Sequence, residues 1–209
     1  MVSRGLATLI QECKVAFEAK MRLAGTPTKS ILQPPATARE IAAFENEHGI
    51  EFPTSYREFL LLHNGWVNYR AIYTLIGVSG AHTIKALKAV ERFTALFSKK
   101  WAAATRPTDE AFIREYESKG KKNGKNVEAA RLYIPNKLFF GSDLEVAVLF
   151  FNSSSRGRDG EMEAIHTDIT WRIHGRFGSF PEMLESHLAA TRKMVAAMEK
   201  NRAKRLKGR

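Results

Sequence analysis

The sequence predicts an α+β protein with a central, mostly antiparallel sheet flanked by helices, an extra N-terminal helix and a long basic C-terminal helix. Three observations predict this class. Apolar residues recur at helical spacing in four segments before residue 102, strand-like segments separated by turn residues follow between residues 131 and 174, and helical spacing returns after residue 179. Helices followed by a run of strands are typical of α+β domains.

The first predicted helix covers residues 5–24, where the apolar residues fall on one helical face. These residues are Leu6, Leu9, Ile10, Cys13, Phe17, Met21 and Ala24. Gly25 ends the helix, and residues 25–36, which contain three prolines, predict a linker. We therefore expect this helix to be an appendage docked on the body rather than part of its core.

Capping residues delimit the next two helices. Thr37 and Glu40 form a capping-box pattern, and Gly49 suits the end of that helix. Pro53 suits the first turn of another helix, because its missing N–H would be unpaired there anyway. Asn64 and Gly65 tolerate left-handed geometry and end it. Further on, the sequence predicts a strand at 71–78, a helix at 82–101, a shorter helix at 109–118 and a surface loop at 119–126.

The second half of the chain predicts successive strands and a closing helix. The strands are predicted at residues 138–141, 145–152, 162–167 and 170–174. A polar hairpin loop at 153–160 joins the second and third of them, and a capping box from Ser179 to Glu182 starts the C-terminal helix. The expected organisation is an N-terminal helix with linker (1–36), an α+β domain (37–190) and a basic helical extension (191–209).

The net charge of +11 is concentrated at the C-terminus. Residues 191–209 hold eight Lys and Arg against one acid, which gives +7, whereas the other 190 residues hold 25 against 21, which gives +4. A basic face over the whole domain, typical of nucleic-acid binders, is therefore not indicated. The tail itself has three interpretations: a solvated helix end, a contact for an acidic protein, or a phosphate-binding arm.

Cysteine use and hydropathy indicate a cytoplasmic protein without a membrane partner. Cys13 is the single cysteine, which excludes an intramolecular disulfide and a multi-cysteine zinc site. The best apolar run, residues 146–151, is too short to span a membrane. Gln11, Glu12 and Lys14 interrupt the N-terminal apolar stretch, which therefore does not resemble a signal peptide.

A pattern with fixed spacing extends over residues 41–65. It reads Ile41-x-x-Phe44-Glu45-x-x-x-Gly49-x-x-Phe52-Pro53-x-x-Tyr56-x-x-Phe59-Leu60-x-x-x-Asn64-Gly65. This pattern resembles the opening motif of the SUKH superfamily, which includes the fungal cell-wall assembly regulators. Weaker similarity at residues 140–143 and 178–184 extends the resemblance over about residues 37–190. Phe52 replaces the usual leucine, and residues 140–143 lack the usual paired glycines.

The resemblance implies an α+β fold with a central, mostly antiparallel sheet. For bacterial members it also implies immunity proteins that bind and block toxins delivered between cells. The motif residues themselves are interpreted as structural, because the aromatic positions form the buried stripe of two packed helices and the others terminate them. The motif therefore identifies a fold and transfers no catalytic site.

No catalytic constellation is recognisable, so we expect neither enzymatic activity nor a cofactor. Cys13 lies on an apolar helical stripe, where an inert thiol is expected. His166 and Asp168 would share one side of a strand, but no further metal ligand is evident, and no metal site is expected. Glu161 and Glu163 at a strand start do not form a convincing acid–base pair. A P-loop, a dinucleotide-binding glycine motif and a nucleophile elbow are all missing from the sequence.

Partner contacts are expected from aromatic and arginine residues outside the core pattern, because these residues dominate interface energetics. The first choice lies just past the Asn-Gly stop and comprises Trp66, Asn68, Tyr69 and Arg70. The alternative there is that the two aromatic rings cover the sheet edge. The second choice lies in the predicted hairpin loop and comprises Arg156, Arg158 and Asp159. An ordinary solvated loop is the alternative for these three.

The main functional hypothesis is an immunity protein that sterically neutralises a cognate toxin in the cytoplasm. Because the chain is basic, we expect the toxin to offer an acidic contact surface or to bind away from the tail. The toxin's identity and the oligomeric state stay open at this point. The alternatives are a regulatory adaptor or scaffold, and nucleic-acid binding through the basic tail.

Overall fold

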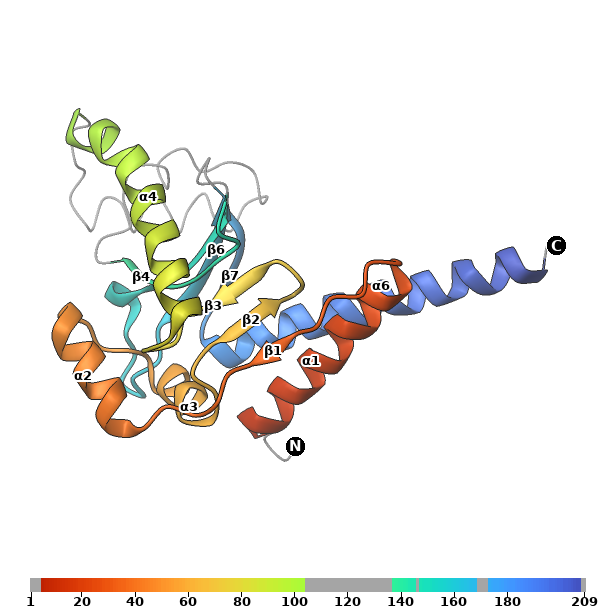
Figure 1. Ribbon diagram of the computed structural model, residues 1–209, viewed down its shortest axis with the longest axis horizontal. Helices are drawn as coiled ribbons and strands as arrows, with labels where there is room; N and C mark the ends of the chain where they lie inside the picture. Colours follow the sequence, from red (N-terminus) through yellow and green to blue (C-terminus); the bar gives the residue numbers. More distant parts are fainter. Residues whose placement is uncertain (1–4, 104–136, 146, 169–172, 208–209) are drawn as a thin grey trace.

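The computed structural model describes residues 5–103, 137–145, 147–168 and 173–207 (Figure 1). Its helices are α1 (Leu6–Leu23), α2 (Ala38–His48), α3 (Thr54–Leu62), α4 (Ala81–Ala103) and α6 (Phe180–Lys207). Its strands are β1 (Ile31–Leu32), β2 (Trp66–Tyr69), β3 (Tyr73–Leu75), β4 (Lys137–Ser142), β5 (Ala147–Asn152), β6 (Glu163–Asp168) and β7 (Ile173–Phe177). The helix predicted at 109–118 and the loop predicted at 119–126 lie outside the described residues.

The strands form one seven-stranded sheet in the order β1 to β7, with every neighbouring pair antiparallel. The α+β class and the antiparallel sheet are therefore confirmed. β5 and β6 pair without a register shift from Ala147↔Asp168 to Asn152↔Glu163. The loop predicted at 153–160 does join these two strands, and it begins with a short 3-10 turn at Ser153–Ser155. The sequence missed β1 and β2.

Each face of the sheet packs against different helices, because successive strand residues point to opposite sides. Phe140 of β4 belongs to the main core, which also contains buried residues of α1, α2, α3 and α6. Its neighbour Phe139 packs instead against a smaller cluster that includes Ile76 and, from α4, Val90. The helices α1, α3 and α6 therefore cover one face, and α4 covers part of the other. Figure 1 shows α4 standing away from the α1–α6 pair.

Local capping follows the sequence pattern closely. Thr37 Oγ1 accepts a hydrogen bond from Glu40 N at 3.2 Å, and the Glu40 carboxylate accepts one from Thr37 N at 2.7 Å, so the predicted capping box of α2 is confirmed. Gly49 ends α2 at φ 61°. Pro53 takes the N-cap position, so that α3 begins one residue later than predicted. Ser179 Oγ caps α6 by accepting from Glu182 N at 3.3 Å.

The expectation that the first helix is an appendage is wrong. Six side chains of α1 are buried in the main core: Leu6, Leu9, Ile10, Cys13, Ala16 and Phe17. The predicted linker at 25–36 is also held to the body, because its residues Ile31–Leu32 form the edge strand β1 against β2. Backbone hydrogen bonds from Asn64 N to Pro34 O (2.9 Å) and from Ala36 N to Leu60 O (2.9 Å) hold the end of this segment to α3 and the residues after it.

The helix α6 has a buried half and a projecting half. Its first turns bury Phe180, Met183, Leu184 and Leu188 in the main core. Residues 201–205 are exposed, and Figure 1 shows this end of the helix extending beyond the body. The basic C-terminal extension is therefore helical as far as Lys207, as predicted. Among the helices that the structure describes, none combines the length and the apolar character needed to cross a bilayer.

Candidate partner-binding site

The β2–β3 hairpin carries the residues that the sequence favoured for partner contact, but its two aromatic side chains face inward. Trp66 and Tyr69 are both 0% exposed. The Tyr69 ring packs edge-on against Phe17 of α1 with 5.2 Å between centroids, and Trp66 Nε1 donates to Ser30 Oγ at 2.6 Å. The expectation that Trp66 and Tyr69 offer exposed contact area is wrong, because α1 and the β1 segment cover them.

The other two favoured residues, Asn68 and Arg70, lie in the strained part of the hairpin. Asn68, Arg70 and Ala71 have φ values of 58°, 51° and 82°. Residues other than glycine rarely adopt such angles, and the cost is about 1 kcal/mol or more each. Asn68 Nδ2 donates to Lys29 O at 2.9 Å, while Arg70 turns towards α6 and places Nη1 3.3 Å from His187 Nε2.

Arg70 borders a cavity of about 650 Å³ between the β2–β3 hairpin, the β4–β5 turn, the strands β6 and β7, and the first turns of α6. We call it the hairpin pocket. Its polar lining includes Arg70, Tyr73, Asp143, His166, His174 and His187. Volumes of this order are typical of ligand-binding clefts.

His187 is a strongly perturbed group of the hairpin pocket. Its burial, the Arg70 charge and the nearby His166 together lower the pKa of His187 to about 2. The neutral ring carries one proton, and Nε2 must accept because it faces a guanidinium. The proton is therefore on Nδ1, which donates to Tyr69 Oη at 2.6 Å. Burial raises the pKa of Tyr69 well above its usual value, so this hydroxyl stays neutral as well.

A second aromatic pair lies beside the first. Tyr73 Oη and His166 Nε2 are 2.7 Å apart, and the His166 ring lies 5.2 Å from His174 and 6.2 Å from His187. Despite three neighbouring imidazoles, no group of three or more His, Cys, Asp or Glu side chains within the described ranges has a metal-binding arrangement. The arrangement suits recognition of a polar group by hydrogen bonds and one fixed cation.

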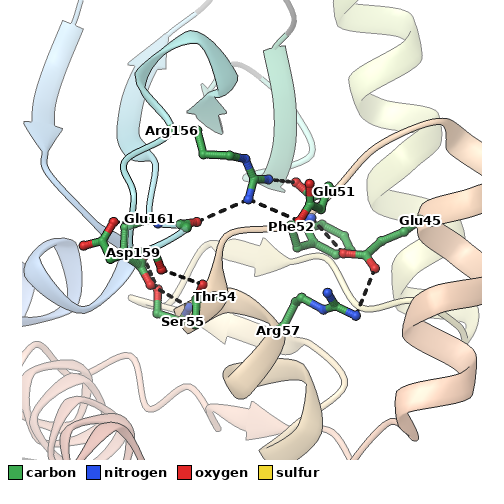
Figure 2. Close-up of polar contacts among 10 residues, drawn as sticks. Glu45, Glu51, Phe52, Thr54, Ser55, Arg57, Arg156, Asp159 and Glu161 are labelled. Carbon is green, nitrogen blue, oxygen red and sulfur yellow. Dashed lines mark hydrogen bonds and ion pairs between the residues drawn. The ribbon is translucent and has the colours of Figure 1, made fainter.

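The second predicted contact region, the β5–β6 loop, is held against the α2–α3 turn (Figure 2). Arg156 Nη2 donates to Glu51 O at 2.7 Å, and Nη1 pairs with the Glu51 carboxylate at 3.4 Å. The backbone oxygen of Asp159 accepts from Thr54 Oγ1 at 3.0 Å. Arg156 and Asp159 therefore hold this loop in place, while the side chain of Arg158 is exposed.

Figure 2 also shows how this loop completes α3. Pro53 at the N-cap position of α3 offers no side-chain cap. The carboxylate of Glu161, which lies much later in the sequence, supplies one. It accepts from Ser55 N at 2.8 Å and from Ser55 Oγ at 2.6 Å. A carboxylate at a helix N-terminus is stabilised by the unpaired N–H groups and the helix dipole. Glu161 thus has a structural role.

The structure does not bring the two predicted contact regions together. Ala147 at the start of β5 borders the hairpin pocket, whereas Asn152 at its end leads into the β5–β6 loop. The two regions are separated by the length of this strand, about 17 Å at ~3.4 Å per residue. The partner-binding role of Asn68, Arg70, Arg156, Arg158 and Asp159 stays a prediction.

The pocket residues Tyr73, His166 and His187 were not predicted as partner-binding residues from the sequence. His187 recurs at helical spacing with Leu184 and Leu188, which is more typical of a core position than of a site. Its partner Tyr69 lies 118 residues away in the sequence. The available signal was a histidine on an otherwise apolar helical stripe, and it does not reveal the partner.

The fold and the site define an α+β protein whose described strands form one antiparallel sheet, with a pocket of mixed polar and apolar lining beside the β2–β3 hairpin. The chain matches the family model described as SMI1 / KNR4 family (SUKH-1) over residues 35–186, and it belongs to this family. The SUKH resemblance is thereby confirmed. α1 and the projecting half of α6 lie outside the matched residues. A search among curated proteins returned no matching relative.

Proposed function

We propose that this protein is an immunity protein that binds a cognate toxin in the cytoplasm and sterically blocks the toxin's active cleft. The observation that carries the proposal is the SUKH-1 family membership over residues 35–186. The resemblance to that superfamily implies toxin-binding immunity proteins for its bacterial members. In this proposal the chain acts as a stoichiometric binder, performs no catalytic step and needs no cofactor.

The rim of the hairpin pocket is the contact surface that we favour. Arg70 is half-buried beside a cavity, and Ile72 at the hairpin tip is 58% exposed. An arginine next to an exposed apolar side chain at a concave site has the character of an interface anchor. A complete interface of about 800 Å² per partner would extend well beyond the hairpin.

The charge of the chain favours a partner with an acidic contact surface. The basic end of α6 would attract such a partner over distance, which raises the association rate more than the affinity. Tight binding would then depend on the buried contacts near the hairpin.

The proposal is tested in two steps. The full chain is immobilised, exposed to nuclease-treated lysate of its source, washed at low and high salt, and the retained protein is identified by mass spectrometry. That protein is then expressed alone and together with this chain. The proposal is supported if the captured protein alone arrests growth and co-expression of this chain restores it. A retained protein that is harmless, or still toxic beside its binder, overturns it, and several harmless partners would favour a regulatory adaptor.

A further inference from the structure

We propose that the hairpin pocket is a carboxylate-binding site in which Arg70 pairs with an acidic side chain of the protein partner. The assignment of this carboxylate to a protein partner rests on the function proposed above. The ability of the pocket to bind a carboxylate does not depend on that function. Three observations carry the inference: Arg70 has no carboxylate beside it among the described residues, the backbone around it is strained, and the cavity has a polar lining.

The Arg70 guanidinium contrasts with the other half-buried arginines of the described ranges. These are Arg57, Arg156 and Arg176, and each forms an ion pair with a glutamate. Arg70 forms no ion pair within those ranges, and its side-chain contact is with the neutral ring of His187. A half-buried cation without a counter-charge is unfavourable, and an incoming carboxylate would relieve that cost. Two parallel hydrogen bonds to one carboxylate would also match the guanidinium geometry.

The backbone strain of the described chain is concentrated at the same place. Its non-glycine residues with positive φ are Asn68, Arg70, Ala71 and Leu144. The first three lie in the β2–β3 hairpin and the fourth in the β4–β5 turn, and both turns border the pocket. Strained residues persist where surrounding contacts hold them, and they cluster at binding sites. Arg70, one of these residues, lines the cavity and reaches His187 of α6.

The charges of the other described lining residues do not neutralise Arg70. Asp143 is the acidic residue among the described lining, and its Oδ1 already accepts from Glu145 N at 3.0 Å and Ala147 N at 2.8 Å. The charge of Arg176 is paired with Glu163. Arg70 is therefore a cation of this pocket that no carboxylate of the described residues neutralises, and the Tyr73–His166 pair lies beside it.

The chemistry is tested with two matched probes on the full chain. N-acetyl-aspartate N-methylamide carries one carboxylate, and the asparagine analogue replaces it by a neutral amide. We expect saturable NMR shifts of the Arg70 Nε–H and His187 ring signals with the aspartate probe, with a dissociation constant in the millimolar range. The asparagine probe, and Arg70→Gln with the aspartate probe, should give no saturable shift. Arg39→Gln, the same change at an exposed position on α2, should bind as the unaltered chain does.

Equal binding of both probes, or undiminished binding of the aspartate probe by Arg70→Gln, overturns the carboxylate site. An unchanged circular dichroism spectrum and melting temperature show that Arg70→Gln is folded. Whether the carboxylate comes from the protein partner is tested with the captured protein. Arg70→Gln should weaken its binding at least about tenfold, and Arg39→Gln should not. A toxin that is neutralised equally well by Arg70→Gln would overturn this inference and leave the proposed function standing. If the chain binds the aspartate probe selectively but neutralises no toxin, the proposed function is overturned and the carboxylate site stands.

Discussion

The indole of Trp66 lies in the main core between α1 and the β1 segment, and its N–H is bonded to Ser30. Trp66→Ala removes this ring and leaves both a cavity and an unpaired buried hydroxyl. The free energy of unfolding should fall by about 3 to 5 kcal/mol. Urea denaturation followed by circular dichroism measures the change.

Ile72 provides the matched control for Trp66, because it belongs to the same hairpin and is 58% exposed. Ile72→Ala should change the free energy of unfolding by no more than about 0.5 kcal/mol. If Trp66→Ala proved equally mild, the indole would not be a core side chain.

His187 predicts a pH-dependent stability with a definite sign. Its pKa is about 2 in the folded protein and near 6.5 in the unfolded chain, so the unfolded state binds the extra proton. The contribution of neutral His187 is therefore complete above pH 6.5 and is lost progressively as the pH falls towards 2. Between pH 6 and pH 4.5 the protonation of this one group should lower the free energy of unfolding by about 2 kcal/mol.

The variant His187→Gln cannot titrate, so its free energy of unfolding should fall about 2 kcal/mol less than that of the unaltered chain between pH 6 and pH 4.5. Urea denaturation of both proteins at the two pH values measures the difference. Parallel pH profiles would show that His187 is not held neutral by burial and Arg70.

Burial of single residues was the least predictable feature of the sequence. The alternative that Trp66 and Tyr69 cover the sheet edge was closer to the structure than the expectation of exposed contacts. Whether an aromatic ring is exposed depends on what packs over it, and here that is α1, about 50 residues earlier in the chain. Cys13, in contrast, is buried as predicted, because its helical stripe alone indicated the inward face.

At the scale of single elements, the N-terminus of α3 depends on a residue from a distant loop. Glu161→Ala removes the carboxylate that accepts from both donors of Ser55. The free energy of unfolding should fall by about 1 to 2 kcal/mol, the usual cost of losing a helix cap. Glu47→Ala, an exposed position on α2, is the control and should be nearly neutral. Equal stabilities of the two variants would contradict the capping role.

The projecting end of α6 predicts salt-sensitive binding to polyanions. Residues 199–209 contain six Lys and Arg and one acid, and residues 199–205 are exposed. A chain without residues 199–209 should elute from heparin at distinctly lower salt, because fewer counterions are released on binding. Its melting temperature should stay unchanged, since the buried turns of α6 are retained.

A variant with these six Lys and Arg residues changed to Gln separates charge from length. It should elute as early as the truncated chain. Unaltered retention of both variants would exclude the tail as the polyanion-binding element, and with it nucleic-acid binding through the tail.

Most elements could be predicted from local patterns, and the failures have a common physical cause. Thr37 and Glu40 mark the start of α2 because a capping box satisfies backbone donors within four residues. The two-residue strand β1 has no such local signature. It exists because Ile31 and Leu32 pair with Val67 and Trp66, more than 30 residues away.

For the whole molecule, the helices at the two ends of the chain are parts of one core. Cys13 Sγ lies 3.5 Å from Leu184 O, and Arg192 of α6 pairs with Glu12 of α1 at 2.7 Å. The candidate site has the same long-range character, since the Tyr69–His187 contact joins the hairpin to α6. Spacing along the chain predicted α1 and α6, but it missed β2, which carries Tyr69, and it did not show which residues meet.

If α1 belongs to the core, damage to it must destabilise the distant sheet. Ile10 is 0% exposed, and Ile10→Ala should lower the free energy of unfolding by about 2 to 5 kcal/mol. Because small domains unfold cooperatively, amide hydrogen exchange in β5 should accelerate by at least about tenfold. Val15→Ala on the same helix, at a position 64% exposed, should leave the β5 amides unchanged. An Ile10→Ala variant with normal exchange in β5 would mean that α1 unfolds separately, as an appendage would.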